Sequence, residues 1–150
     1  MGDRVCLIVD DEPVIRKYLR LVLQRIDLQS LEAKDAVEAL RILRERGDQI
    51  NLVITDIKMP GDMDGIDLAY SMQNSFSGLP VILISGFVDK VPAGFTFVRK
   101  PFLPDELLEA IEKTMDGSRI RRKDGTDSKI TEMKPASQRS GPVRPPPEAA

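Results

Sequence analysis

The stretch VCLIVDDEP at residues 5–13 decides the fold. Five apolar residues run directly into Asp10 and Asp11, and an unbroken run of this kind is typical of a strand covered on both faces, as in a parallel sheet. Asp11 or Glu12 can then cap a helix that has Pro13 in its first turn. The stretch therefore predicts a buried strand, a short acidic turn and a helix, which together begin an α/β unit.

The same pattern recurs along the chain. Three further apolar segments each end at a polar residue: residues 52–55 before Asp56, residues 81–84 before Ser85 and, more weakly, residues 95–99 before Lys100. A fifth, weaker strand is predicted at residues 28–32. Buried runs of this length, each followed by a polar residue, indicate that several parallel strands end at one edge of a sheet.

Helical spacing of apolar residues fills the segments between these runs, at residues 13–26, 36–43, 66–72 and 104–115. Asp35 is placed to cap the second helix and Gly47 to end it. Alternating strands and helices predict right-handed crossovers and an α/β fold with a doubly wound, five-stranded parallel sheet. Only nine residues, Pro92 among them, separate Ser85 from Phe95, so the fourth helix is predicted to be short or missing.

Composition divides the chain into two parts. Residues 3–116 are predicted to form one domain, and residues 117–150 a disordered tail that is basic and rich in proline. Residues 1–116 hold 14 basic and 20 acidic side chains, a net charge of −6, whereas residues 117–150 hold 8 and 4, a net charge of +4. An acidic folded part argues against nucleic acid as its direct partner.

The cellular compartment is predicted from the single cysteine and from the short length of the apolar segments. Cys6 is the only cysteine, so no disulfide can form within the chain, and its place in an apolar run indicates a buried thiol. No apolar stretch reaches the ~18–20 residues of a membrane span, and the N-terminus has no signal-peptide pattern. We therefore expect a cytoplasmic protein that does not contact a membrane.

The polar residues after the strands form a candidate site, because the carboxyl ends of parallel strands are where open α/β sheets bind ligands. Asp10, Asp11 and Asp56 would repel one another unless a cation joined them, and Mg2+ suits carboxylates and phosphate oxygens. Lys100 can then neutralise a phosphoryl group, to which Ser85 can donate a hydrogen bond. Each residue alone has a plain structural explanation as a cap, turn or loop residue. These explanations do not account for the four together.

The motifs LIVDDEP at residues 7–13, DIKMP at 56–60 with Asp64 and Gly65, ISG at 84–86 and KPF at 100–102 resemble the receiver domain of two-component signalling. The resemblance covers about residues 3–116 and implies a flavodoxin-like fold. It implies that Asp56 accepts the phosphoryl group and that Mg2+ is the cofactor. It also gives the other site residues their roles: Asp10, Asp11, Asp56 and the carbonyl of Lys58 for the metal, Lys100 for the phosphate, and Ser85 with Phe97 for the switch.

The resemblance also implies the partners. A histidine kinase or a histidine phosphotransfer protein would donate the phosphoryl group, because the chain contains no histidine, and the output partner is unknown. The chain would be a signalling phosphoacceptor that catalyses its own phosphoryl transfer and slow dephosphorylation. The long loop at residues 59–65 and the short connection after Ser85 are similar to those of receivers in hybrid histidine kinases and of some stand-alone receivers.

Three other functions fit part of this sequence. Haloacid-dehalogenase-type phosphatases use an Asp nucleophile, Mg2+, a Ser or Thr and a Lys, but need an Asp-x-Asp on the first strand, where this chain has Asp10 and Asp11 side by side. A receiver-shaped module that is never phosphorylated would not need the complete site. A nucleic-acid regulator acting through the basic residues 119–123 would need a DNA-binding fold, which the sequence does not show.

Overall fold

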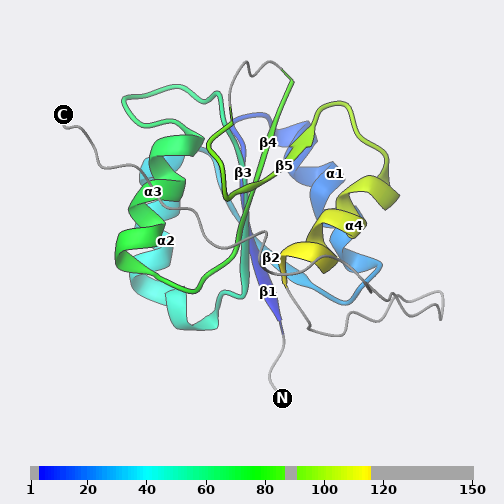
Figure 1. The fold of residues 1–150 in the computed structure, drawn as a ribbon. Coiled ribbons are helices and arrows are strands. Elements are labelled where there is room, and N and C mark those ends of the chain that lie inside the picture. The colour runs from blue at the N-terminus through cyan, green and yellow to red at the C-terminus, as the bar shows by residue number, and fades with distance from the viewer. Residues whose placement is uncertain (1–3, 87–90, 116–150) are drawn as a thin grey trace.

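The computed structural model describes residues 4–86 and 91–115. Five strands form one parallel sheet in the order β2-β1-β3-β4-β5 (Figure 1). The strands are β1 (Val5–Val9), β2 (Gln29–Ala33), β3 (Leu52–Asp56), β4 (Val81–Ser85) and β5 (Thr96–Arg99). The helices are α1 (Pro13–Gln24), α2 (Ala36–Arg46), the short 3-10 helix η1 (Gly47–Gln49), α3 (Gly65–Ser75) and α4 (Pro104–Thr114). The predicted doubly wound α/β fold is confirmed.

Helices cover both faces of the sheet, so the molecule has three layers. In Figure 1 the sheet stands between α2 and α3 on the left and α1 and α4 on the right. Side chains alternate along each strand: Ile8, Ile54 and Ile84 pack on the α1 and α4 side, whereas Val53 and Leu83 pack on the α2 and α3 side. Both clusters are buried, and this explains why the strands read as continuous apolar runs rather than alternating ones.

The caps at the helix starts only partly follow the sequence expectation. Glu12, one of the two residues predicted to cap α1, stands at its N-cap position, but the Glu12 side chain accepts no cap hydrogen bond. Pro13, whose missing N–H needs no partner in the first turn, begins this helix as predicted. Asp35 caps α2 as predicted, with Oδ1 accepting from the Glu38 N–H at 2.9 Å.

The connection between β4 and β5 is described at residue 86 and at residues 91–95, and no helix is found at these positions. This agrees with the prediction that a fourth helix is short or missing there. The helix after β5, α4, begins at Pro104 and is the last element of the described chain. The expected disordered tail at residues 117–150 lies outside the described residues.

Burial of the single thiol gives a test of this packing. Cys6 lies in the centre of the sheet with no exposed surface, and burial raises the pKa of its thiol. We expect the native protein to resist a thiol reagent such as DTNB, whereas the urea-unfolded chain should react with one equivalent. Fast labelling of the native protein would contradict this packing of β1.

Candidate functional site

Four strand ends meet at one edge of the sheet. Asp10 follows β1 directly, Asp56 and Ser85 are the last residues of β3 and β4, and Lys100 follows β5. Main-chain bonds continue past the strands and fix these ends: the Ile57 N–H donates to the Ile84 carbonyl at 2.9 Å, and the Lys100 N–H donates to the Ser85 carbonyl at 3.0 Å. The sheet therefore brings the predicted residues to a single edge.

An ammonium group lies between two of the carboxylates. Lys100 Nζ is 3.3 Å from Asp10 Oδ2 and 3.5 Å from Asp56 Oδ1. The Asp10 side chain has no exposed surface, and that of Asp56 is 8% exposed. The Lys100 side chain is 21% exposed. This is a partly buried ion cluster rather than a surface salt bridge.

The surroundings of Asp10 and Asp56 disfavour the charged forms of these two side chains. Burial, followed by the charge of Asp10, raises the pKa of Asp56 to about 6, although Lys100 opposes the shift. Burial also raises the pKa of Asp10, against a hydrogen bond of 2.8 Å from the Glu12 N–H to Asp10 Oδ1. Burial alone would lower the pKa of Lys100, but Asp10 and Asp56 outweigh it and raise that pKa. The edge carries more negative charge than Lys100 balances.

The acidic residues fit a divalent cation. Asp10, Asp11 and Asp56 each offer one carboxylate oxygen, and these atoms all lie within 4.8 Å of one another. The set consists of hard oxygen donors with no thiolate or imidazole, which suits Mg2+ rather than Zn2+. Asp11 is exposed, so the site opens to solvent on one side. A cation here would also favour the charged form of Asp56 and so oppose the rise in its pKa that burial and Asp10 cause.

The remaining predicted residues lie around this cluster. Ser85 is buried at the end of β4. Phe97 is half-buried on β5 opposite Leu83, which lies two residues before Ser85 and therefore on the same face of the sheet. Lys58 lies two residues beyond Asp56 with its side chain exposed, and metal binding by its carbonyl stays a prediction. Ser85 and Phe97 are thus diagonal neighbours on adjacent strands.

Sequence reasoning assigned no role to the start of α3. Asp64 caps this helix, with Oδ1 accepting from the Ile66 and Asp67 N–H groups at 2.9 Å each. Gly65 follows, and its N–H donates to the Ile57 carbonyl at 2.9 Å. A Cβ on Gly65 would collide with the Asp56 carbonyl oxygen. In the sequence, the signal for this contact was a glycine directly after a capping aspartate. Only the folded structure shows that this glycine lies against the Asp56 backbone.

Comparison with known proteins agrees with this geometry. The family model described as the response regulator receiver domain matches residues 6–112. The C4-dicarboxylate transport transcriptional regulatory protein DctD of Pseudomonas aeruginosa is 32% identical over 123 residues, which cover 76% of this chain and 26% of that protein. The sensor kinase CckA of Brucella abortus is 30% identical over 122 residues, covering 77% of this chain and 13% of that protein.

Solved structures give the same result. A CheY-like response regulator receiver domain protein from Methanospirillum hungatei superposes with a TM-score of 0.67 at 26% identity, covering 77% of this chain and 95% of that one. A response regulator receiver domain protein from Clostridium thermocellum has a TM-score of 0.67 at 28% identity, covering 75% and 94%. The chain thus spans about a quarter or less of the curated relatives named above, but nearly the whole of these receiver structures.

The contact at Gly65 can be tested by substitution. Gly65→Ala should lower the free energy of unfolding by about 1–3 kcal/mol, because the added methyl overpacks the Asp56 and Ile57 backbone. It should also shift the amide resonances of Asp56 and Ile57. Gly78→Ala is the control: φ at Gly78 is +92° with nothing within 4 Å, so it should cost about 1–2 kcal/mol of backbone strain and leave those resonances in place. Unchanged Asp56 resonances in Gly65→Ala would contradict the contact.

Proposed function

The chain belongs to the response regulator receiver domain family, and from that premise we propose that it takes a phosphoryl group onto Asp56 and signals through a conformational change. The observation that carries the proposal is the buried Asp56 carboxylate, 3.5 Å from Lys100 Nζ and beside Asp10 and Asp11. A carboxylate in this position is a nucleophile with positive charge at hand for the group that it receives.

The phosphoryl donor lies outside the 150 residues of this sequence. The chain has no histidine of its own, so a phosphohistidine would come from a histidine kinase or a histidine phosphotransfer protein. A sensor kinase and a transcriptional regulatory protein are both among the relatives, which places similar domains in proteins of either kind. The output partner of this chain is left open.

The transfer follows from the positions of the side chains. An Asp56 carboxylate oxygen forms the new bond to phosphorus while the bond from the donor nitrogen to phosphorus breaks, and that nitrogen keeps the electron pair. Lys100 can turn its ammonium from the two carboxylates to the phosphoryl oxygens, where it neutralises charge. Mg2+, held by Asp10, Asp11, Asp56 and the Lys58 carbonyl, would supply further positive charge to those oxygens.

Two residues on adjacent strands would carry the signal away from the site. The phosphoryl group offers new acceptor oxygens, and the Ser85 hydroxyl at the end of β4 can move toward them as a donor. Phe97 lies diagonal to Ser85 on the same face and is only half-buried, so it can turn toward the space that Ser85 leaves. One covalent event would thereby shift the balance between two arrangements of this surface.

The proposal includes the setting of the domain. Among residues 4–86 and 91–115, none of the helices has the length and apolar character needed to cross a bilayer. We place the receiver at residues 3–116 in the cytoplasm. The domain acts as a signalling phosphoacceptor rather than a classical enzyme, and its own catalysis is limited to phosphoryl transfer and slow dephosphorylation.

The acceptor can be tested with a small phosphodonor. Acetyl phosphate and Mg2+ should add one phosphoryl group that is lost in base, as acyl phosphates are, and intact mass spectrometry can count it. Asp56→Asn should abolish the addition, because an amide is not a nucleophile. Asp48→Asn, in η1 and away from the site, should be labelled like the wild type. Full labelling of Asp56→Asn would refute the assignment.

The metal can be tested without any phosphoryl transfer. Titration with Mg2+ at millimolar concentration should shift the amide resonances around Asp11, Asp56 and Lys58, and Asp10→Asn should weaken the response because one carboxylate charge is lost. Calcium or manganese can serve as comparison ions. A wild-type protein whose spectrum does not respond to Mg2+ would favour a module that is never phosphorylated.

A further inference from the structure

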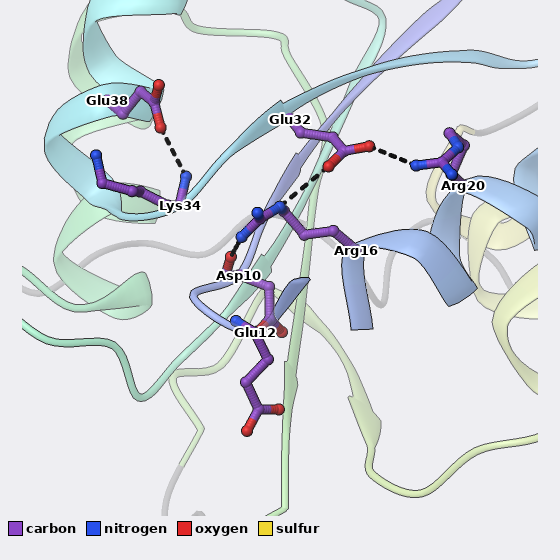
Figure 2. Close-up of polar contacts among 7 residues, drawn as sticks. All are labelled: Asp10, Glu12, Arg16, Arg20, Glu32, Lys34 and Glu38. Carbon is purple, nitrogen blue, oxygen red and sulfur yellow. Dashed lines mark hydrogen bonds and ion pairs between the residues drawn. The ribbon is translucent and has the colours of Figure 1, made fainter. Parts of the chain in front are cut away.

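The main chain of Asp10 is held by an arginine that the proposed phosphoryl transfer does not use. Arg16, in the first turns of α1, donates from Nη1 to the Asp10 carbonyl oxygen at 2.6 Å (Figure 2). The same guanidinium donates from Nε to Glu32 Oε1 at 3.0 Å. Figure 2 shows the side chain lying between Asp10 on one side and Glu32 on the other. The short bond to Asp10 is a charge-assisted contact with a buried residue.

Glu32 anchors the arginine from the neighbouring strand. It lies on β2 opposite Ile8 of β1, and its second oxygen accepts from Arg20 Nη1 at 2.8 Å. The two guanidiniums differ in what else they touch. The Arg16 side chain is 18% exposed and reaches Asp10, whereas that of Arg20 is 38% exposed and donates to Glu32. Arg20 therefore provides a matched comparison for Arg16.

The bond from Arg16 fixes the peptide unit that joins the two adjacent aspartates. The carbonyl of Asp10 and the N–H of Asp11 belong to one planar peptide group. A hydrogen bond that holds the Asp10 carbonyl oxygen therefore also fixes the orientation of the Asp11 N–H. The other polar groups of Asp10 are also engaged: its N–H donates to the Ala33 carbonyl at 3.1 Å, and its Oδ1 accepts from the Glu12 N–H at 2.8 Å. Asp11, by contrast, is exposed, and its placement depends on the peptide before it.

We propose that Arg16 is a positioning residue for the cation site, acting through the Asp10 carbonyl to set the Asp10–Asp11 peptide and thereby the relative positions of the two carboxylates. The proposal rests on the proposed function insofar as the cation is Mg2+. Groups that orient metal ligands from behind commonly change metal affinity by ~10–100-fold when they are removed. Arg16 has this relation to Asp10 and Asp11 without offering a ligand atom itself.

A purely structural role makes a different prediction. If Arg16 served only to join α1 to the edge strand through Glu32, then Arg16 and Arg20 would be alike, since both pair with the same carboxylate. Removing either arginine side chain would then change the stability of the protein and leave its affinity for Mg2+ unchanged. The positioning role predicts that only the residue in contact with Asp10 changes the metal site.

The experiment compares Arg16→Ala with Arg20→Ala in the full chain. Isothermal titration calorimetry with Mg2+ gives the affinity, and the melting temperature gives the stability. We expect Arg16→Ala to bind Mg2+ about 10-fold more weakly than the wild type, and Arg20→Ala to bind it like the wild type even if both melt earlier. Wild-type Mg2+ affinity in a folded Arg16→Ala protein would overturn the proposal, as would an equal loss in Arg20→Ala.

If Arg16→Ala does not fold, Arg16→Lys replaces it, because a lysine can reach Asp10 or Glu32 but cannot hold both with one planar fork. Reduced Mg2+ affinity in that variant supports the proposal, and unchanged affinity overturns it.

A metal-free measurement separates this proposal from the proposed function. The amide resonances of Asp11 and Glu12 in the absence of Mg2+ should shift in Arg16→Ala and stay in place in Arg20→Ala, because the peptide is released only in the first. If the wild type neither binds Mg2+ nor is phosphorylated, the proposed function fails while this readout still decides whether Arg16 positions the peptide. Identical Asp11 resonances in Arg16→Ala and the wild type would overturn the role of Arg16.

Discussion

Repulsion among carboxylates gathered at one sheet edge is the constraint on which the rest of this site depends. Strands β1 and β3 are paired in the middle of the sheet, so Asp10 and Asp56 cannot move apart without breaking the core. Lys100 reaches them from the far side of β4 and balances part of their charge, while burial and, after it, the charge of Asp10 raise the pKa of Asp56 to about 6. The edge therefore retains an excess of negative charge, which a divalent cation can balance.

The apolar runs were enough to predict the sheet and the edge at which the site lies. The runs of β1, β3 and β4 are buried and that of β5 is partly buried, and the polar residue at the end of each run stands at the carboxyl end of a strand. Asp10, Asp56, Ser85 and Lys100 could thus be brought to one edge from spacing alone. Their roles came from the resemblance of the motifs to receivers, because spacing does not specify a reaction.

What the sequence could not provide depends on contacts between distant segments. Glu12 occupies the predicted N-cap position of α1 before Pro13, but its side chain does not accept the expected cap hydrogen bond. Gly65 belongs to a recognised motif, but its contact with Asp56 is visible only in the fold, where its Cβ would meet the Asp56 carbonyl oxygen. Arg16 carries no local pattern that points to the site, and it matters because Glu32 lies on the next strand. Such contacts follow from the strand order, which apolar periodicity does not give.

The strand order also bears on the sequence in which the charged residues of the site come together during synthesis. Strands β2, β1 and β3 are neighbours in the sheet and all lie within the first 56 residues, so this half can pair before the rest has left the ribosome. Asp10 and Asp56 come together in that half, whereas Lys100 follows β5, the last strand to emerge. Lys100 is thus the last of the three residues to be synthesised, and until β5 pairs with β4 the charge that its ammonium balances in the folded domain has to be balanced by other positive groups.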